Sequence, residues 1–347
     1  MDDHCERIGK WRPGLYLVMV TIAITAALFV QPVVSMVARA GMHDPLQPVH
    51  SGIPHDALFD MIIDGHGGIA VGDHGLIVRS DNGGRSWQDL GERLGEAALL
   101  GIAVAGRNAV IVGQEGTVYV SDDRTTWSWI DSGVDVRLMN VDLNKHGLAV
   151  AVGAFGTLLR STDAGMTWMP VQVDWDAYLT EAGYEPHLYD VAVDAKGCVL
   201  VVGEFGLVMR STDGGLTWSG VHNDDASLFA LHLRPDGVGY AVGQRGMVLR
   251  TSDDGLTWTP LATPTESNLL GVWSSASDEV VVVGIRELLR SSDGGTTFVA
   301  SDDPRVTRSW YQALATDATK ENTGPDINAD ADLYAAGEGA SITRLVD

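Results

Sequence analysis

Hydrophobic and polar positions divide the chain into two regions. Residues 14–38 contain no charged side chain, and the centre of this run reads LYLVMVTIAITAALFV. From about residue 55 onward, apolar residues occur instead in short runs separated by glycine and polar residues. The long uncharged run is typical of a membrane-spanning helix, whereas short apolar runs bounded by glycines are typical of buried strands.

The second region is built from repeats. A glycine pair that follows small apolar residues recurs as VGDHG, VGQEG, VGAFG, VGEFG and VGQRG, with the weaker copies VGIRE and AAGEG after them. The first glycines are Gly72, Gly113, Gly153, Gly203, Gly243, Gly284 and Gly337. One apolar run precedes each pair, a second follows it, and a turn then leads to a further strand. Four strands per unit of roughly 40–45 residues predict an all-β, seven-bladed β-propeller over residues 41–347.

The seventh copy is shorter than the others. After Ile342-Thr343-Arg344 the sequence reaches Asp347 without another turn and strand. An incomplete last blade would leave an exposed sheet edge. We therefore expect residues near Leu46–Ile53 to supply the missing outer strand and close the ring.

The turn after the third strand carries the motif S-x-D-x-G-x-T-W, here called the Asp box. It reads STDAGMTW at Ser161–Trp168 and STDGGLTW at Ser211–Trp218, with variants at Thr251–Trp258 and Ser291–Phe298. The first copy has Asn82 in place of the aspartate; the second keeps Asp122 but has Arg124 in place of the glycine. The aspartate can accept backbone N–H groups of its own turn, and the aromatic ring can pack between blades. The box therefore indicates a fold and not a reaction.

An arginine precedes the box in five copies, and another stands at the corresponding position of the seventh copy, which has no box. These residues are Arg79, Arg160, Arg210, Arg250, Arg290 and Arg344, and the second copy has Tyr119 instead. Equivalent positions of a propeller lie on a ring, so the six guanidinium groups would share one level of the disc. Two interpretations are open: each arginine ties its turn to the next blade, or together they form a cationic band for an acidic partner segment.

The repeat unit resembles that of the photosystem II assembly and stability factor family. The shared pattern is G-x-x-G-x-(I/V/L)-x-R-(S/T)-(S/T)-D-G-G-x-T-W, and the resemblance covers roughly residues 45–347. It implies a non-catalytic propeller outside the membrane, without a cofactor, whose arginine patch contacts nascent membrane-protein subunits. Related propellers in non-photosynthetic bacteria occur alongside resistance-nodulation-division exporters, and the sequence does not identify a photosynthetic host.

Two insertions interrupt the repeat. The first, Gln172–His187, mixes aromatic and acidic residues and favours a contact loop. Its candidate exposed contacts are Trp175, Tyr178 and Tyr184, with capping of their own blade as the alternative. The second insertion, about Asp302–Ala331, has the composition of a mobile acidic loop.

Polar residues recur in the apolar runs that we expect nearest the propeller axis. Asp60, Asn140, Asp190 and Gln312 occupy corresponding positions there. They are expected to face a central channel, either simply solvating it or forming a cation site. The histidines show no spacing typical of a metal site.

Charge and missing signatures narrow the function. A net charge of −23 excludes nucleic acid as an expected partner. The Arg-Ile-Pro signature of neuraminidases is absent, since Gly52-Ile53-Pro54 lacks the arginine. The sequence favours a non-enzymatic scaffold or assembly factor for an inner-membrane protein or complex. A glycan-binding or glycoside-hydrolysing propeller is the alternative.

The N-terminal region sets the expected location. Arg7, Lys10 and Arg12 precede the uncharged run, which favours a cytoplasmic tail at residues 1–13, a single-pass anchor at residues 14–38 and a propeller on the periplasmic side of the inner membrane. Ala38-Arg39-Ala40 fits a signal-peptidase site, so cleavage and release into the periplasm is the alternative.

Overall fold

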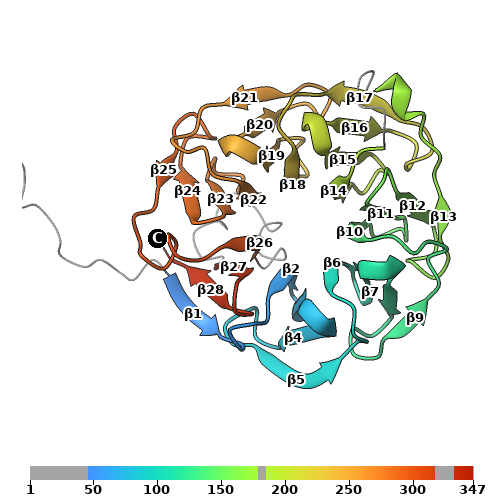
Figure 1. The fold of residues 1–347 in the computed structure, drawn as a ribbon, viewed down its shortest axis with the longest axis horizontal. Coiled ribbons are helices and arrows are strands. Elements are labelled where there is room, and N and C mark those ends of the chain that lie inside the picture. Colours follow the sequence, from blue (N-terminus) through green and yellow to red (C-terminus); the bar gives the residue numbers. More distant parts are fainter. Residues whose placement is uncertain (1–45, 179–184, 317–331, 347) are drawn as a thin grey trace, which may run out of the picture. The chain divides into compact units, whose positions relative to one another are not determined.

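The computed structural model describes residues 46–178, 185–316 and 332–346. They form seven four-stranded antiparallel sheets arranged as blades around a central channel (Figure 1). In blades 1 to 6 the strands follow one another in chain order from the channel outward. The prediction of an all-β, seven-bladed propeller is confirmed.

Blades 1 to 4 use consecutive strands of the chain. Blade 1 contains β2 (Leu58–Asp64), β3 (Gly67–Gly72), β4 (Leu76–Ser80) and β5 (Gln88–Arg93). Blade 2 contains β6 (Leu99–Ala105), β7 (Asn108–Gly113), β8 (Val118–Ser121) and β9 (Ser128–Ile130). Blade 3 contains β10 (Leu138–Leu143), β11 (Ala149–Gly153), β12 (Leu158–Ser161) and β13 (Met169–Pro170). Blade 4 contains β14 (Leu188–Val193), β15 (Val199–Gly203), β16 (Val208–Ser211) and β17 (Ser219–His222).

Blades 5 and 6 repeat this plan, and blade 7 combines both ends of the propeller. Blade 5 contains β18 (Leu228–Leu233), β19 (Gly239–Gly243), β20 (Val248–Thr251) and β21 (Thr259–Leu261). Blade 6 contains β22 (Leu269–Ser274), β23 (Val280–Gly284), β24 (Glu287–Ser291) and β25 (Val299–Ala300). Blade 7 contains β26 (Tyr311–Thr316), β27 (Leu333–Gly337), β28 (Ile342–Leu345) and β1 (Leu46–His50).

The outer strand of blade 7 comes from the other end of the propeller. Strand β1 pairs antiparallel with β28, and Leu46 lies opposite Leu345. This confirms that the segment beginning at Leu46 closes the ring. Without it, β28 would present an unpaired edge to solvent.

The recurring first glycine of each repeat is required because two backbone segments approach each other closely at this position. A Cβ atom at Gly72 would lie 2.0 Å from the carbonyl oxygen of Ala57, and one at Gly243 would lie 1.9 Å from that of Ser227. Any side chain here would push the second strand away from the start of the first. This steric limit explains why the glycine recurs in every copy.

The hydrophobic core is divided among the seven interfaces between blades. Each interface has its own cluster of buried apolar residues, and six clusters contain the aromatic residue of an Asp box. Trp258 of blade 5, for example, packs with Leu200 and Val202 of blade 4. At the interface of blades 6 and 7, where blade 7 has no box, Leu46 and Val306 contribute instead.

The two ends of the disc carry different loops. Asp boxes join the third and fourth strands at one end, here called the box end. Hairpin turns join the second and third strands at the opposite end, here called the turn end. Four of these turns are the short helices η1 (Asp73–Gly75), η2 (Gln114–Gly116), η4 (Glu204–Gly206) and η5 (Gln244–Gly246). They stand in front of their blades in Figure 1, so the view is from the turn end.

The predicted tail at residues 1–13 and anchor at residues 14–38 lie outside the described residues. Among the residues that are described, no helix has the length and apolar character of a membrane span.

Candidate partner-binding site

The Asp box forms a closed network of hydrogen bonds. In blade 4, Ser211 Oγ donates to Asp213 Oδ1 over 2.8 Å, Thr217 N donates to the same oxygen over 2.9 Å, and Thr217 Oγ1 donates to Oδ2 over 2.6 Å. These donors, the Thr217 hydroxyl first, hold the pKa of the Asp213 carboxyl well below its usual value. In blade 1, Asn82 accepts from Ser86 N in the same way over 2.9 Å. The carboxylate oxygens of the box aspartates thus accept hydrogen bonds from their own turns.

The box of blade 2 is one residue shorter than the other boxes. Asp123, and not Asp122, accepts from Ser121 Oγ over 3.0 Å and from Thr126 N over 2.7 Å. Residue Val120 pairs with Val110 in the same register in which Arg160 pairs with Val150. The position that corresponds to the box arginines is therefore Val120, and the assignment of Tyr119 was wrong.

Arg124, from the shortened box, bridges blades 2 and 1. Its Nη1 donates to Asp64 Oδ1 over 2.8 Å, and its Nη2 donates to Asp64 Oδ2 over 2.6 Å and to the Gly106 carbonyl. The residue is buried, with 8% of its surface exposed. In the sequence pattern, Arg124 is evident only as the residue that replaces the box glycine, and this bridge was not predicted.

Two of the box arginines tie their blades to the next box. Arg160 Nε donates to the carbonyl of Gly214 over 2.5 Å, and Arg210 Nε donates to that of Asp254 over 2.9 Å. Gly214 and Asp254 occupy the same box position in the following blade. Arg250 reaches the next box through Tyr240, whose hydroxyl accepts from Arg250 Nε over 3.3 Å and donates to Gly294 O over 3.0 Å.

The remaining box arginines have other surroundings. Arg344 Nε donates to Asp332 Oδ1 over 2.7 Å, and Arg290 Nη1 lies 3.4 Å from Glu279 Oε1. The Arg79 side chain makes no hydrogen bond within the part of the chain that the structure describes. The six guanidinium groups therefore share one position in the fold but differ in their contacts.

Inter-blade bonding leaves most donors of three arginines unused. Arg160, Arg210 and Arg250 are half-buried, and none of their Nη atoms has a hydrogen-bond partner among the described residues. None of these atoms is among the buried polar atoms that lack a partner. Each guanidinium is thus fixed by Nε and presents its outer donors to solvent.

The aromatic residues of the first insertion do not form an exposed contact surface where they are described. Trp175 is only 8% exposed and belongs to the core between blades 3 and 4, which corrects its assignment as an exposed contact. Tyr178 lies over Gly220 and donates its hydroxyl to Trp218 O over 2.8 Å. Trp175 and Tyr178 therefore cap the region of blades 3 and 4. Tyr184 lies outside the described residues.

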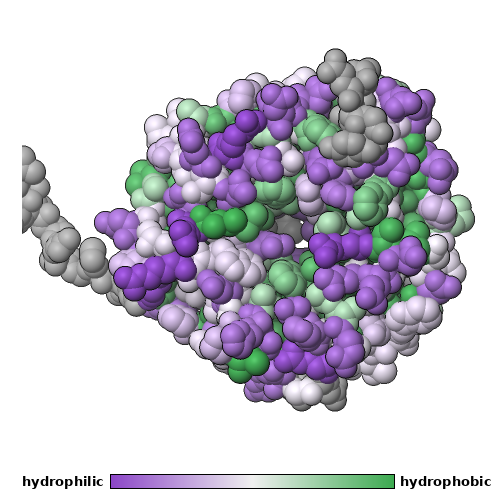
Figure 2. Space-filling view, in the orientation of Figure 1, coloured by the Kyte–Doolittle hydropathy of each residue, from purple (hydrophilic) through white to green (hydrophobic). Residues whose placement is uncertain are grey.

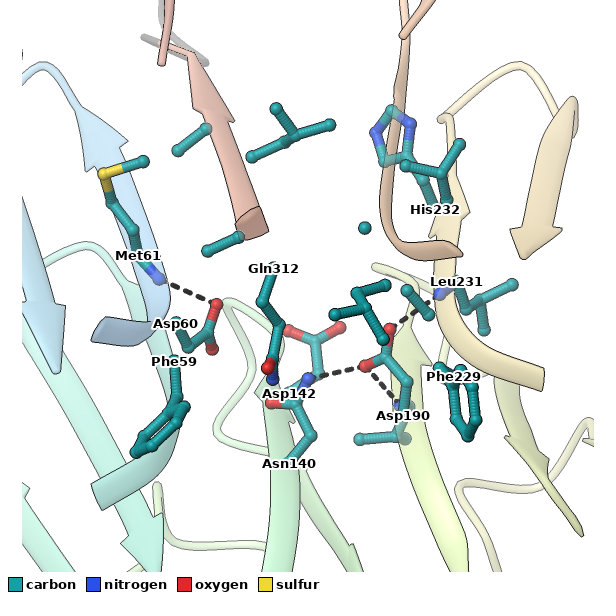
Figure 3. Close-up of a pocket in the computed structure, with 18 of the residues that line it drawn as sticks. Phe59, Asp60, Met61, Asn140, Asp142, Asp190, Phe229, Leu231, His232 and Gln312 are labelled. Atoms are coloured by element: carbon teal, nitrogen blue, oxygen red, sulfur yellow. Dashed lines mark hydrogen bonds between the residues drawn. The ribbon is translucent and has the colours of Figure 1, made fainter. Parts of the chain in front are cut away.

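Polar side chains of the inner strands connect blades around the channel. Asp60 Oδ2 accepts from Ile102 N of blade 2 over 2.8 Å, Asp142 Oδ2 from Val193 N of blade 4 over 2.6 Å, and Asp190 Oδ2 from Leu231 N of blade 5 over 2.7 Å. His232 Nδ1 accepts from Ser274 N of blade 6 over 2.9 Å. Each group thereby satisfies an inner-edge N–H of the next blade, and Figure 3 shows these residues around the channel.

Burial in the channel shifts the pKa values of these groups. Loss of hydration raises the pKa of Asp60 to about 7, that of Asp142 to about 6 and that of Asp190 to about 8, against the opposing effect of the backbone N–H donors. Burial also lowers the pKa of His232 to about 4, so its imidazole is neutral near pH 7. Neither Asp142 nor His232 was predicted from the sequence as a channel group.

The channel itself has a volume of about 350 Å³. Asp60, Asn140, Asp190 and Gln312 all line it, as expected. Strand register, however, shows that the residue of blade 7 equivalent to Asp60 is Ala313 and not Gln312, so the predicted correspondence of Gln312 was wrong. No set of three or more metal-binding side chains comes together within the described residues. The observed role of the channel carboxylates is to accept backbone N–H groups.

Comparisons with known proteins support the fold. No family model and no curated protein matches the chain. The solved structure of YCF48 bound to D1 peptide has a TM-score of 0.66 and 19% identity, covering 89% of this chain and 97% of that chain. YCF48 from Cyanidioschyzon merolae has a TM-score of 0.68 and 16% identity, covering 87% of this chain and 98% of that chain.

A third solved structure is that of an enzyme. The GH74 xyloglucanase from Xanthomonas campestris has a TM-score of 0.65 and 17% identity, and the match covers 86% of this chain but 52% of that chain. Likeness at such identities establishes the fold alone. By its architecture, the chain is a seven-bladed β-propeller similar to YCF48 and to other propellers of different activities.

Proposed function

We propose that the chain is a non-catalytic scaffold or assembly factor for a membrane-protein complex. Residues 14–38 hold it at the inner membrane with the propeller on the periplasmic side; cleavage after Ala40 would instead release the propeller into the periplasm. The similarity to YCF48, one structure of which holds a D1 peptide, supports a propeller that binds a protein partner. In a non-photosynthetic bacterium, a resistance-nodulation-division exporter would suit this role.

The observation that carries the proposal is the set of unused guanidinium donors at the box end. Arg160, Arg210 and Arg250 are held by Nε, and their outer N–H groups face solvent. A guanidinium fixed in this way loses little conformational freedom on binding and can donate to a carboxylate through two parallel hydrogen bonds. An acidic segment of a partner protein is the ligand that fits. Arg79, Arg290 and Arg344 occupy the equivalent positions in blades 1, 6 and 7.

Cross-linking in native membranes tests this proposal. The full chain carrying Arg160→Glu and Arg210→Glu should lose capture of a specific inner-membrane protein, because two donor pairs become repulsive carboxylates. Arg245→Glu is the matched control, since Arg245 is exposed at the turn end. Unchanged capture by the double variant, with circular dichroism showing an intact fold, would contradict a partner site at the box end.

A glycoside-hydrolysing or glycan-binding propeller is the second candidate. Two observations favour it: the similarity to the GH74 xyloglucanase and the raised pKa of Asp190, which keeps a proton available near neutral pH. Asp190 is, however, already bonded to Val191 N, Leu231 N and Asn140 Nδ2. Turnover of any member of a fluorogenic glycoside panel that disappears in Asp190→Asn would favour the enzyme over the scaffold.

A further inference from the structure

Large apolar side chains form a ring at the turn-end mouth of the central channel. In each blade, the inner-strand residue after the one that pairs with the first glycine lines the channel. Blade 7 has Gln312 at this position, and blades 1 to 6 have half-buried apolar or aromatic residues, namely Phe59, Leu100, Met139, Tyr189, Phe229 and Leu270. We call these six residues the channel mouth. Figure 2, which views the turn end, shows the surface hollowed at the centre of the ring.

Aromatic rings lie on opposite sides of the channel mouth. Tyr189 of blade 4 and Phe229 of blade 5 meet edge to face, with ring centroids 5.1 Å apart. Across the ring of blades, Phe59 of blade 1 stacks with Trp310, with centroids 6.3 Å apart. Figure 3 shows Phe59 and Phe229 on the two sides of the channel. The faces of such rings carry negative potential and attract cations.

Carboxylates line the channel inside the mouth. Asp60 and Asp190 directly follow mouth residues in their strands, and Asp142 lies three residues after Met139, roughly 10 Å further along the strand. Asp60 and Asp142 each accept two backbone N–H groups, whereas a carboxylate can accept about four hydrogen bonds. Both side chains therefore retain acceptor capacity besides their bonds to the backbone.

No cationic side chain balances these carboxylates. Within the part of the chain that the structure describes, no lysine or arginine lines the channel, and its ionisable residues are Asp60, Asp142, Asp190, Tyr189 and His232. His232 Nδ1 accepts from Ser274 N, and its ring is neutral near pH 7. Burial raises the pKa values of Asp60 and Asp190, and the charge of Asp142 raises both further. A cation in the channel would relieve this repulsion.

We propose that the channel, entered through its mouth, binds an alkylammonium group, supplied by a lysine side chain or by a free primary amine. The methylene stem packs against the ring of apolar side chains, the aromatic faces attract the charge at the entrance, and Asp60 and Asp142 accept hydrogen bonds from the ammonium group. The volume of about 350 Å³ suits a ligand of this size. The site is separate from the box arginines, which belong to the proposed function and lie at the other end of the disc.

Isothermal titration calorimetry of the full chain in dodecyl maltoside micelles tests the site with n-butylamine and 1-butanol. The two probes share one alkyl stem and differ in the ammonium group. At pH 7.5 we expect n-butylamine to bind at least about tenfold more tightly, because only the amine gains from the rings and the carboxylates. Equal binding of the two probes, or binding of neither, would overturn the proposal.

Variants of the two parts of the site should weaken binding separately. Asp60→Asn with Asp142→Asn keeps one acceptor oxygen at each position and should weaken n-butylamine binding about tenfold or more. Phe229→Leu keeps an apolar side chain without the aromatic face and should weaken it about threefold. Trp129→Leu is the matched control, since Trp129 is 61% exposed on the outer strand of blade 2. Unchanged binding in both channel variants, with circular dichroism showing an intact fold, would overturn the proposal.

The pH dependence of binding gives a readout that apolar contact alone would not. The affinity for n-butylamine should rise about threefold or more from pH 6 to pH 8, because Asp60 and Asp190 lose protons in this range while the amine stays charged. The affinity for 1-butanol should stay constant. An equal pH dependence of the two probes would show that the carboxylates do not hold the ammonium group, which contradicts the proposal.

A lysine derivative distinguishes the two sources of the ammonium group. Tighter binding of Nα-acetyl-lysine-N-methylamide than of n-butylamine assigns the channel to a lysine of a polypeptide, and the reverse order assigns it to a free amine. The chain with Arg160→Glu and Arg210→Glu should bind n-butylamine unchanged. Loss of partner capture in that chain together with unchanged amine binding, or the absence of amine binding in a chain that captures its partner, shows which of the two proposals fails.

Discussion

Neighbouring blades are joined by side chains in the channel and by side chains at the box end. The two groups of side chains use different shares of their hydrogen-bonding capacity. In the channel, Asp190 accepts three hydrogen bonds, from Val191 N, Leu231 N and Asn140 Nδ2. At the box end, Arg160 and Arg210 each donate one hydrogen bond to the next blade and leave their Nη groups to solvent. The difference indicates that the channel groups serve stability, whereas the box arginines retain capacity for a partner.

Arg124 offers the strongest test, because it lies at the box end but is buried like a channel group. Arg124→Met should lower the free energy of unfolding by about 3–5 kcal/mol, since Asp64 would remain largely buried without its cation. Urea unfolding measures the change. Arg85→Met is the matched control: the Arg85 side chain is 66% exposed, and its loss should have almost no effect. Equal losses of unfolding free energy in the two variants would contradict the distinction between buried, hydrogen-bonded arginines and arginines that face solvent.

Asp190 tests the channel. Asp190→Leu should lower the free energy of unfolding by about 2–3 kcal/mol, because three buried donors lose their acceptor. Asp190→Asn keeps one acceptor oxygen and should cost less. Urea unfolding of the two variants side by side checks this order; a purely electrostatic role for the carboxylate predicts equal effects, because both variants remove the charge.

The pH dependence of stability should separate the two levels. The channel aspartates have raised pKa values, so the folded protein holds protons between about pH 4 and pH 8 that the unfolded chain has released. Stability should therefore fall by about 1 kcal/mol or more as the pH rises through this window. The box aspartates have lowered pKa values, and their contribution is present above about pH 4 and lost in stronger acid.

Thermal unfolding across pH 3–9 checks both limbs of this dependence. The decline toward pH 8 should become shallower in Asp190→Asn and remain unchanged in a box variant such as Asp253→Asn. A profile that rises steadily from pH 4 to pH 8 would show that the backbone donors outweigh burial in the channel.

The smallest effect on stability is expected at the box arginines. Arg160→Met should lower the free energy of unfolding by only about 0.5–1 kcal/mol, since one partly exposed hydrogen bond to Gly214 O is lost. The main effect of Arg160→Met should be a loss of partner capture in native membranes. A loss of stability as large as that of Arg124→Met would assign Arg160 a structural role alone.

The fold could be predicted because most blades repeat the same local requirements. A glycine at a close approach, an aspartate closing its own turn and an aromatic ring between blades all leave a signal within one repeat. Ring closure followed from the short seventh copy together with the cost of an open edge.

The site could be predicted only in part, because its contacts join residues of different repeats. Arg160 donates to Gly214, and Asp142 accepts from Val193, and neither pairing leaves a pattern within one copy. The shortened second box shifted the assignment from Val120 to Tyr119. Trp175 could not be distinguished as buried because the gap it fills is formed by two blades.

Ring closure by β1 and β28 also determines when the fold can be completed. The pairing of Leu46 with Leu345 joins residues from the two extremes of the propeller. Such a contact forms late, because contacts between distant parts of a chain carry a large loop-closure entropy and slow folding. During synthesis, β1 leaves the ribosome early and waits for β28, the last of the described strands to emerge. The seventh blade is therefore the step at which folding, and protection of the chain from proteases, becomes complete.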